Sequence, residues 1–320
     1  MDNYLVTGGA GFIGSHLVER LVEDGHTVTV LDNFSTGRMQ NIAHLEGRQL
    51  RVVEGDIRNV ADVAKAMKGQ AFVLHHAALP SVQRSVEDPV ASNEANVGGT
   101  LNVLVAARDA RVRRVVYASS SAAYGDTPTL PKIETMQPQP MSPYAVSKLA
   151  GEHYCRVFTM NYGLETVALR YFNIFGPRQD PESDYAAVVP KFVTLLLAHK
   201  RPFVYGDGKQ TRDFTYVANA VEANLLACRA PRAAGEFMNI ACGDRVAVSG
   251  LCNMIGEIAG KVLEPKLKPA RSGDVRHSLA DITKAAELIG YRPIVNLREG
   301  LERTVEWYAK RASKASTSKK

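Results

Sequence analysis

The chain alternates short apolar runs with stretches in which apolar residues recur every three or four positions. The runs predict strands and the stretches predict helices. Strands are expected over Tyr4–Thr7, Thr27–Leu31, Arg51–Glu54, Phe72–His75, Val115–Ala118 and Thr166–Arg170. Helices are expected over Ile13–Glu23, Val60–Met67, Ala95–Ala107 and Tyr144–Met160. This alternation, with nearly continuous apolar strands, indicates an α/β fold with a Rossmann-type doubly wound parallel sheet.

The pattern loosens after residue 173, where Gly and Pro interrupt it more often. We therefore expect a first domain over residues 1–173. Part of the segment near 214–239 has a helical pattern again, and this segment is expected to return to the first domain. Residues 174–213 and 240–309 are expected to form a smaller C-terminal lobe that binds the substrate. Such a lobe would close a cleft at the carboxyl ends of the strands, where open parallel sheets bind their ligands.

The net charge of +6 raises the question of nucleic-acid binding. Five positive charges and no negative ones lie in residues 310–320, so removing these five from +6 leaves +1 for the rest. A nearly neutral body with a basic end predicts a disordered, solvated tail and no nucleic-acid partner.

No run of about 18 apolar residues occurs and the chain begins without a basic-then-apolar leader, so we expect neither a membrane span nor a signal peptide. The four cysteines form no C-x-x-C pair, which fits a cytoplasmic protein. No carboxylate or cysteine spacing accompanies His75, His76 and His277. Packing or solvation explains these histidines better than metal binding, and no metal site is predicted.

A glycine-rich turn follows the first predicted strand. Gly8, Gly11 and Gly14 have the spacing G-x-x-G-x-x-G between a strand and a helix, which is typical of turns that bind a dinucleotide pyrophosphate. Gly8 would permit the tight turn, Gly11 a close backbone approach, and Gly14 the packing of helix on strand. The helix start, at Phe12 and Ile13, would face the phosphates.

An acidic residue ends the second strand. Asp32 would accept hydrogen bonds from ribose hydroxyls and repel a 2′-phosphate, so it and its neighbour Asn33 predict NAD rather than NADP. Arg38 is near enough in sequence to leave that preference open. After the third strand, Asp56 and Ile57 would contact the adenine edge, unless Asp56 caps the following helix instead.

Three further residues form the strongest chemical pattern. Ser120 follows a predicted strand, with the adjacent Ser121 as its alternative. Ser142-Pro143 predicts a helix start, which puts Tyr144 and Lys148 one turn apart on the same face.

A free phenol has a pKa near ~10 and is a poor base at neutral pH. A neighbouring ammonium and the positive nicotinamide of NAD+ would favour the phenolate. Tyr144 would then take a proton from a substrate hydroxyl while hydride leaves for the cofactor, and Ser120 would hydrogen-bond the same oxygen.

Together these motifs resemble the extended short-chain dehydrogenase/reductase family, and within it the bacterial UDP-N-acetylglucosamine and UDP-glucose 4-epimerases. The resemblance extends to about Tyr308. It rests on TGGAGFIG (7–14), LDNFSTG (31–37), ASSSAAYG (118–125), SPYAVSK (142–148), LRYFNIFGPRQDP (169–181), VYGDGKQTRDFTYV (204–217) and RSGDVRHSLAD (271–281). It implies an isomerase that inverts C4 of a UDP-sugar with bound NAD, through a transient 4-keto sugar.

The resemblance also implies roles for single residues. Tyr144 becomes the acid and base, Lys148 its electrostatic partner, and Ser120 the hydroxyl contact. Ala77 would contact the cofactor. Contacts to the UDP-sugar are implied for Ser81, Asn173, Ala187, Val188, Phe203, Gly206, Arg212, Arg271, Asp274 and Ser278. The two arginines would clamp the diphosphate, because guanidinium forks suit phosphate oxygens.

Substrate choice and assembly follow from the same resemblance. A bulky Tyr at position 278 would crowd a 2-acetamido group, whereas Ser278 leaves room, so UDP-GlcNAc and UDP-GalNAc are expected as substrates beside UDP-Glc and UDP-Gal. The other interpretation is that Ser278 caps a helix that begins near Ala280. A homodimer through the helices 95–107 and 144–160 is also implied.

Three other functions compete with this one. Dehydration needs an Asp-Glu pair after the hydroxyl residue, but Ser121-Ala122 follow Ser120. A UDP-glucuronate 4-epimerase or decarboxylase needs a cation for the sugar carboxylate, and Asn173-Ile174-Phe175 offers none. This enzyme stays open as an alternative, as does a non-catalytic NAD-binding sensor, which the presence of both Tyr144 and Lys148 disfavours.

Overall fold

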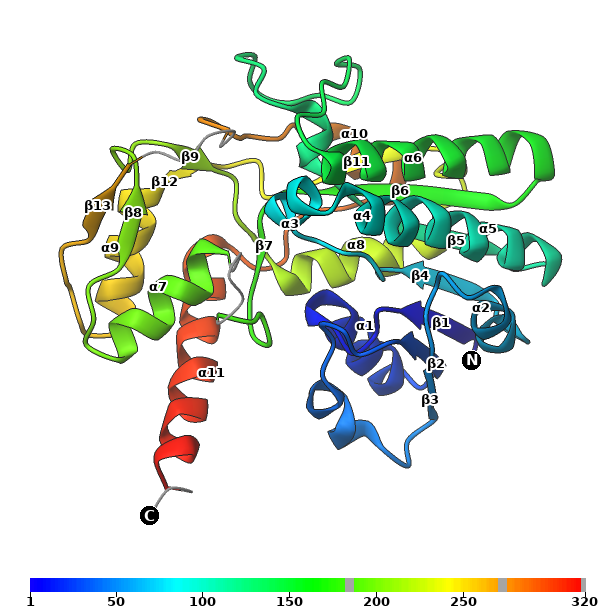
Figure 1. Cartoon of the computed structure of the whole chain (residues 1–320), viewed down its shortest axis with the longest axis horizontal. Helices are drawn as coiled ribbons and strands as arrows, with labels where there is room; N and C mark the ends of the chain where they lie inside the picture. The colour runs from blue at the N-terminus through cyan, green and yellow to red at the C-terminus, as the bar shows by residue number, and fades with distance from the viewer. Residues whose placement is uncertain (182–186, 270–274, 318–320) are drawn as a thin grey trace.

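A seven-stranded parallel sheet forms the centre of the larger domain (Figure 1). The computed structural model describes residues 1–181, 187–269 and 275–317. The strands follow the order β3-β2-β1-β4-β5-β6-β11, and the direction of winding reverses between β1 and β4, where such sheets bind their ligands. Their bounds are β1 Asn3–Thr7, β2 Thr27–Asp32, β3 Leu50–Glu54, β4 Phe72–His75, β5 Arg114–Ser120, β6 Glu165–Tyr171 and β11 Phe237–Ile240.

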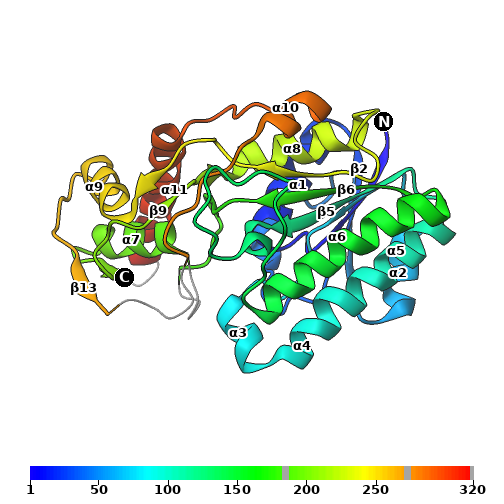
Figure 2. The same ribbon diagram turned by 90° about the horizontal axis from the view of Figure 1, so that it is seen from above.

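Helices cover both faces of this sheet (Figure 2). One buried cluster joins one face to α1, α8 and α10, and a second joins the other face to α2, α5 and α6. The Rossmann-type doubly wound fold is therefore confirmed. The helices of this domain are α1 Phe12–Glu23, α2 Val60–Met67, α3 Val82–Glu87, α4 Pro89–Asn93, α5 Gly99–Asp109, α6 Pro143–Tyr162, α8 Val217–Arg229 and α10 Thr283–Ile289, with 3₁₀ turns at Met39–Asn41, Ala43–Leu45 and Ser121–Tyr124.

The six predicted strands all form: Phe72–His75 has the predicted bounds, and the ends of the other five differ by at most two residues. Ser120 ends β5 rather than following it. The seventh strand, β11, is not among the predicted strands. It pairs in parallel with β6, Met238 opposite Leu169, and so the returning segment completes the sheet at its edge.

The helix predicted over 95–107 begins earlier than expected. The chain is helical from Pro89, where α4 begins, and residues Glu94–Gly98 form a π-helical turn between α4 and α5. In this turn the side chain of the buried Asn96 accepts from the Leu79 N–H at 2.7 Å and donates to the Leu79 carbonyl oxygen at 3.1 Å. It also donates to the Ser147 hydroxyl of α6 at 3.1 Å. Local sequence patterns do not encode such a turn, because it depends on this long-range bonding.

The smaller lobe is built around a third buried cluster. Helix α11 packs against α7 and α9, as Figure 1 shows at the left of the molecule. The elements are α7 Val188–Leu197, α9 Val248–Ile258, α11 Leu297–Thr317 and the short strand pairs β8 Phe203–Tyr205 with β13 Lys266–Lys268, β9 Thr211–Arg212 with β12 Val246–Ala247, and β7 Ile174–Phe175 with β10 Thr215–Tyr216.

Two expectations about the C-terminal part are wrong. Residues 283–291 are expected in the lobe, but Ala285, Ile289 and Tyr291 belong to the buried cluster on the sheet. The tail predicted over 310–320 is helical as far as Thr317, because α11 continues past the lobe, and 318–320 lie outside the described residues. Among the described residues, no helix combines the length and the apolar character needed to cross a membrane.

Candidate active site

The glycine-rich turn brings β1, α1 and the end of β4 into close contact. Gly8 has a φ of +68°, and a Cβ there would lie 2.8 Å from the backbone N of Ala77. A Cβ on Gly14 would lie 2.1 Å from the Gly8 carbonyl oxygen, so α1 can pack on the turn only with glycine at this position. The backbone can thus come as near to a ligand as the spacing predicted.

Helix α1 begins at this turn without a side-chain cap from any described residue. Gly11 is the residue before its first turn, and the N–H groups that follow, at Phe12 and Ile13, lie at the positive end of the helix. An uncapped N-terminus beside a turn that excludes a Cβ at Gly8 and Gly14 fits a dinucleotide pyrophosphate.

Asp32 is buried and holds the turn directly. One carboxylate oxygen accepts from the Ala10 N–H and the other from the Phe34 N–H, each at 2.9 Å. Burial raises the pKa of Asp32, and these two hydrogen bonds oppose the rise. Arg38, which left the choice between NAD and NADP open, is ion-paired with Asp180 at 2.6 Å.

Asp56 lies beside Asn33, since the Asn33 amide donates to it at 2.8 Å. It does not cap α2: Asn59 does, accepting from the Ala61 N–H at 2.9 Å. The Arg58 guanidinium beside Asp56 holds the pKa of that carboxyl well below its usual range. The ends of β2 and β3 therefore present an ordered polar edge next to the glycine turn, which also fits the adenosine half of NAD.

The catalytic pattern assembles between β5 and α6. Ser142 caps α6 by accepting from the Ala145 N–H at 3.1 Å, with proline at the first helical position as predicted. The Ser120 hydroxyl and the Tyr144 phenol lie within reach of each other at the cleft, and Ser120 acts to lower the pKa of the phenol. Lys148, one turn further along the helix, donates to the Ala118 carbonyl oxygen at 2.8 Å. The structure thus brings Ser120, Tyr144 and Lys148 together.

Burial dominates the electrostatics of this group. Burial raises the pKa of Tyr144, and the hydrogen bond from Ser120 opposes that rise. Lys148 lies 6.0 Å from the centre of the Tyr144 ring, and burial lowers its own pKa to about 8. Desolvation thus outweighs the nearby hydroxyl at Tyr144, and the predicted acidification, which combines the Lys148 ammonium with the positive nicotinamide, stays a prediction.

A cleft of about 1470 Å³ separates this group from the smaller lobe. Its walls contain ten of the predicted residues, which are Ser81, Ser120, Ser121, Tyr144, Asn173, Ala187, Val188, Phe203, Arg212 and Ser278. Gly206 follows Tyr205, which lines the cleft, and has a φ of +73°. Arg271 and Asp274 lie outside the described residues.

Several of these residues also have structural contacts. The Ser81 hydroxyl caps α3, accepting from the Arg84 N–H at 3.1 Å. The Asn173 amide donates to the Asp213 carbonyl oxygen at 2.9 Å, and Arg212 contacts the Arg276 carbonyl oxygen at 3.1 Å. Ser278 does not cap α10, which begins at Thr283, so the capping interpretation of Ser278 is wrong.

The sequence analysis missed other residues at the cleft. Lys132 lines it although its side chain is buried, and it donates to the Thr127 carbonyl oxygen at 2.5 Å. Burial lowers the pKa of Lys132. His277 also lines the cleft and bonds the Thr211 hydroxyl at 2.9 Å. No motif marks Lys132, since only the pairing of its strand-like segment with Ala280 brings it there.

The two histidines at the end of β4 have packing roles. His75 is buried between the hydroxyls of Thr7 and Thr100, at 2.7 and 2.9 Å. His76 stacks on Tyr171, with ring centres 5.9 Å apart. Burial lowers the pKa of His75 to about 3 and that of His76 to about 4, so both rings are neutral at pH 7.

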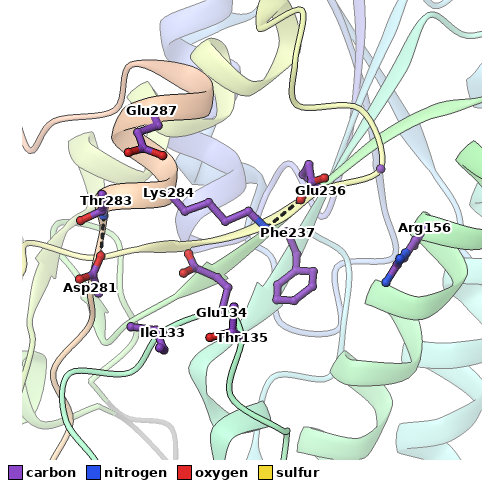
Figure 3. Close-up of a pocket in the computed structure, with 11 residues that line it drawn as sticks. Ile133, Glu134, Thr135, Arg156, Glu236, Phe237, Asp281, Thr283, Lys284 and Glu287 are labelled. Atoms are coloured by element: carbon purple, nitrogen blue, oxygen red, sulfur yellow. Dashed lines mark hydrogen bonds and ion pairs between the residues drawn. The ribbon is translucent and has the colours of Figure 1, made fainter.

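A second pocket of about 600 Å³ lies beside β11, away from the catalytic group (Figure 3). Within it Lys284 pairs with Glu236 at 2.8 Å and lies 4.7 Å from the centre of the Phe237 ring. Its lining residues include none of the predicted site residues.

Comparisons with known proteins agree with this geometry. Residues 4–241 match the model of the NAD dependent epimerase/dehydratase family. A putative UDP-glucose 4-epimerase of Methanocaldococcus jannaschii is 40% identical over 305 residues, which cover 95% of this chain and 97% of the relative.

Two solved structures are similar over nearly the whole chain. The UDP-N-acetylglucosamine 4-epimerase of Methanobrevibacter ruminantium, in complex with UDP-N-acetylmuramic acid, has a TM-score of 0.93 at 39% identity, covering 97% of this chain and 99% of that one. The UDP-glucose 4-epimerase of Thermus thermophilus, in complex with NAD, has a TM-score of 0.86 at 38% identity, covering 96% and 98%.

Proposed function

Because the chain belongs to the NAD dependent epimerase/dehydratase family, we propose that it interconverts the C4 epimers of a UDP-hexose, with UDP-GlcNAc and UDP-GalNAc among its substrates. The observation that carries this proposal is that Ser120 and Tyr144 line one wall of a cleft, with Lys148 buried behind them on α6, in a domain whose glycine turn fits NAD.

The chain's own residues supply the proton chemistry. Held by the glycine turn and Asp32, bound NAD would supply the hydride acceptor and donor for C4. Tyr144 accepts the proton of the C4 hydroxyl and gives it back, since its phenol faces the cleft and already bonds Ser120. The Ser120 hydroxyl orients the same oxygen. The Lys148 ammonium, together with the positive nicotinamide ring, would favour the phenolate form of Tyr144.

Inversion also requires that the sugar turn while the rest of the substrate stays bound. Arg212 lines the cleft on the lobe side and suits the diphosphate, because its guanidinium offers paired donors. The wide cleft leaves the 4-keto sugar room to present its other face. Binding energy from the nucleotide half would in this way position the reacting carbon.

The acceptance of acetamido sugars rests on Ser278. Its side chain lines the cleft, and a hydroxymethyl group there occupies little of the space that a 2-acetamido group needs. UDP-Glc and UDP-Gal, being smaller at C2, would fit as well.

The direct test is to incubate the purified protein with each UDP-sugar and separate the products. We expect UDP-GlcNAc and UDP-GalNAc to interconvert, with no net reduction of NAD. Tyr144→Phe should lower the rate by about 10²- to 10⁴-fold, since it removes only the proton carrier. Turnover of UDP-glucuronate alone would favour the uronate enzyme, and bound NAD without any turnover would favour the sensor.

A further inference from the structure

The helix that carries Tyr144 and Lys148 is bonded to β5 at three successive turns. Tyr144 meets Ser120, Lys148 meets the Ala118 carbonyl oxygen, and Glu152 accepts from the Ser119 hydroxyl. Three consecutive strand residues thus contact three helix residues spaced four apart, a spacing that corresponds to about 6 Å along the helix. The third contact lies outside the mechanism described above.

Glu152 is held on its other side by a buried ion pair. Arg170 donates to both of its carboxylate oxygens at 2.7 Å, and the side chains of Arg170 and Glu152 are 1% and 4% exposed. Arg170 lies on β6 directly opposite Ser119 in the register of the sheet. One carboxylate therefore joins α6 to two neighbouring strands at the level of the reacting residues.

The surroundings hold the Arg170 guanidinium in place. Its central carbon lies 4.6 Å from the centre of the Tyr124 ring and 4.3 Å from that of the Phe237 ring. Helix α6 comes close to β5 here because Gly151 has no side chain; a Cβ on it would lie 2.3 Å from the Tyr117 hydroxyl oxygen. Both partners of the pair are thus fixed before any ligand binds.

The first two contacts cannot fix the position of α6 during the reaction. Ser120 and Tyr144 must share their hydrogen bonds with the substrate oxygen, and Lys148 must respond to charge at the phenol. The Glu152 contact takes no part in the chemistry. Since burying two charges offsets much of their attraction, such a pair is better explained by positional specificity than by stability.

We propose that the group Ser119–Glu152–Arg170 is a positioning device, which sets the axial position of α6 on β5 and so keeps the Tyr144 phenol aligned with Ser120. The proposal rests on the proposed function. It adds three residues that act through Tyr144 and Ser120 without touching the substrate.

The matched variants are Ser119→Thr and Ser119→Val, which have nearly the same shape and differ in one hydroxyl. We expect Val to lower kcat about tenfold relative to Thr, because a small displacement of reacting groups is costly, while KM for the UDP-sugar stays within about twofold. Ser119→Ala, which cannot overfill the site, should behave like Val and covers the case in which Val fails to fold. Ser92→Ala removes another buried serine hydroxyl, on α4, and should leave kcat unchanged.

A second measurement reads the alignment without turnover. In an ultraviolet difference titration, each variant is compared with the same variant carrying Tyr144→Phe, so that the difference reports the Tyr144 phenol alone. Loss of the Ser120 hydrogen bond should move the midpoint of the phenol titration upward by about half a pH unit. The groups that face Lys148 and share this titration are Tyr144, Glu152 and Cys155 on α6, Tyr117 on β5, and His75 and His76 after β4.

Equal kcat and equal midpoints in the Thr and Val variants would overturn the proposal, even if their melting temperatures differed. A parent protein that turns over no UDP-sugar would refute the proposed function alone, because the titration would still reveal whether Ser119 aligns the phenol.

Discussion

Burial decides the charge state of several single residues in this protein. His16, His75 and His76 are enclosed by packed side chains and backbone, and burial lowers their pKa values to about 4, 3 and 4. Asp213 shows the opposite case: burial raises its pKa to about 6, although its carboxylate accepts from the N–H groups of Cys242 and Gly243. The histidines make the folded state sensitive to acid, and Asp213 opposes that effect.

The free energy of unfolding should fall as the pH drops from 7 to 5. The unfolded chain protonates its three histidines below about pH 6.5, whereas the folded chain keeps them neutral, so the unfolded state binds more protons. Asp213 acts in the reverse direction, because the folded state protonates it first. Three groups against one give a net loss on the order of 4 kcal/mol, measurable by urea unfolding at both pH values.

Replacing one buried histidine tests the origin of this loss. His76→Gln should flatten the pH dependence, while His153→Gln, at an exposed position on α6, should leave it unchanged. Equal unfolding free energies of the parent protein at pH 7 and pH 5 would contradict the assignment.

Ser278 provides a second prediction at the residue scale. Ser278→Tyr should reduce turnover of UDP-GlcNAc by about tenfold or more while sparing UDP-Glc, because a pocket that is overfilled by a side chain discriminates against the larger sugar. Ser278→Ala is the control and should keep both activities. The measurement is kcat/KM for the two sugars, and unchanged acetamido turnover in the Tyr variant would refute the gate.

At the scale of elements, the turn between β1 and α1 is the most constrained part of the cofactor site. Its geometry depends on contacts with β4 and with the loop after β2 as much as on its own glycines, since Asp32 and Arg38 bond the N–H and the carbonyl oxygen of Ala10. A change in this turn should therefore affect NAD binding before it affects the sheet.

Gly14→Ala should abolish or strongly weaken NAD binding, because its Cβ would lie 2.1 Å from the Gly8 carbonyl oxygen and α1 would have to move. The matched control is Gly98→Ala, where a Cβ meets no heavy atom within 4 Å. NAD content, measured by absorbance after denaturation, should drop only in the first variant. Full NAD content in Gly14→Ala would show that the helix tolerates the shift.

At the scale of the whole molecule, two bodies of unequal size meet at one cleft. The larger supplies the reacting residues from β5 and α6, and the smaller supplies Arg212 and Ser278. The outer side of α6 carries apolar residues that neither body covers: Val146, Val157 and Met160 are 52%, 42% and 70% exposed.

Such a surface predicts that two copies associate through α6. Light scattering coupled to size-exclusion chromatography should give a dimer for the parent protein and a monomer for Val157→Asp combined with Met160→Asp. Glu306→Gln, at an exposed position on α11, is the control and should remain dimeric. A monomeric parent at micromolar concentration would refute the prediction.

The sequence by itself determined the six strands, the glycine turn, the Ser142 cap and the spacing of Tyr144 and Lys148. These features are local: the period of apolar residues and the chemistry of turns and caps act over a few positions. The resemblance of several motifs then indicated the family, which the comparisons confirmed.

Only the tertiary structure decided the remaining features. The seventh strand, the π-helical turn at Asn96, the continuation of α11 and the place of Lys132 in the cleft all depend on partners far away in the chain. The pKa of Tyr144 belongs to the same class, because desolvation is set by everything packed around a group and not by its neighbours in sequence.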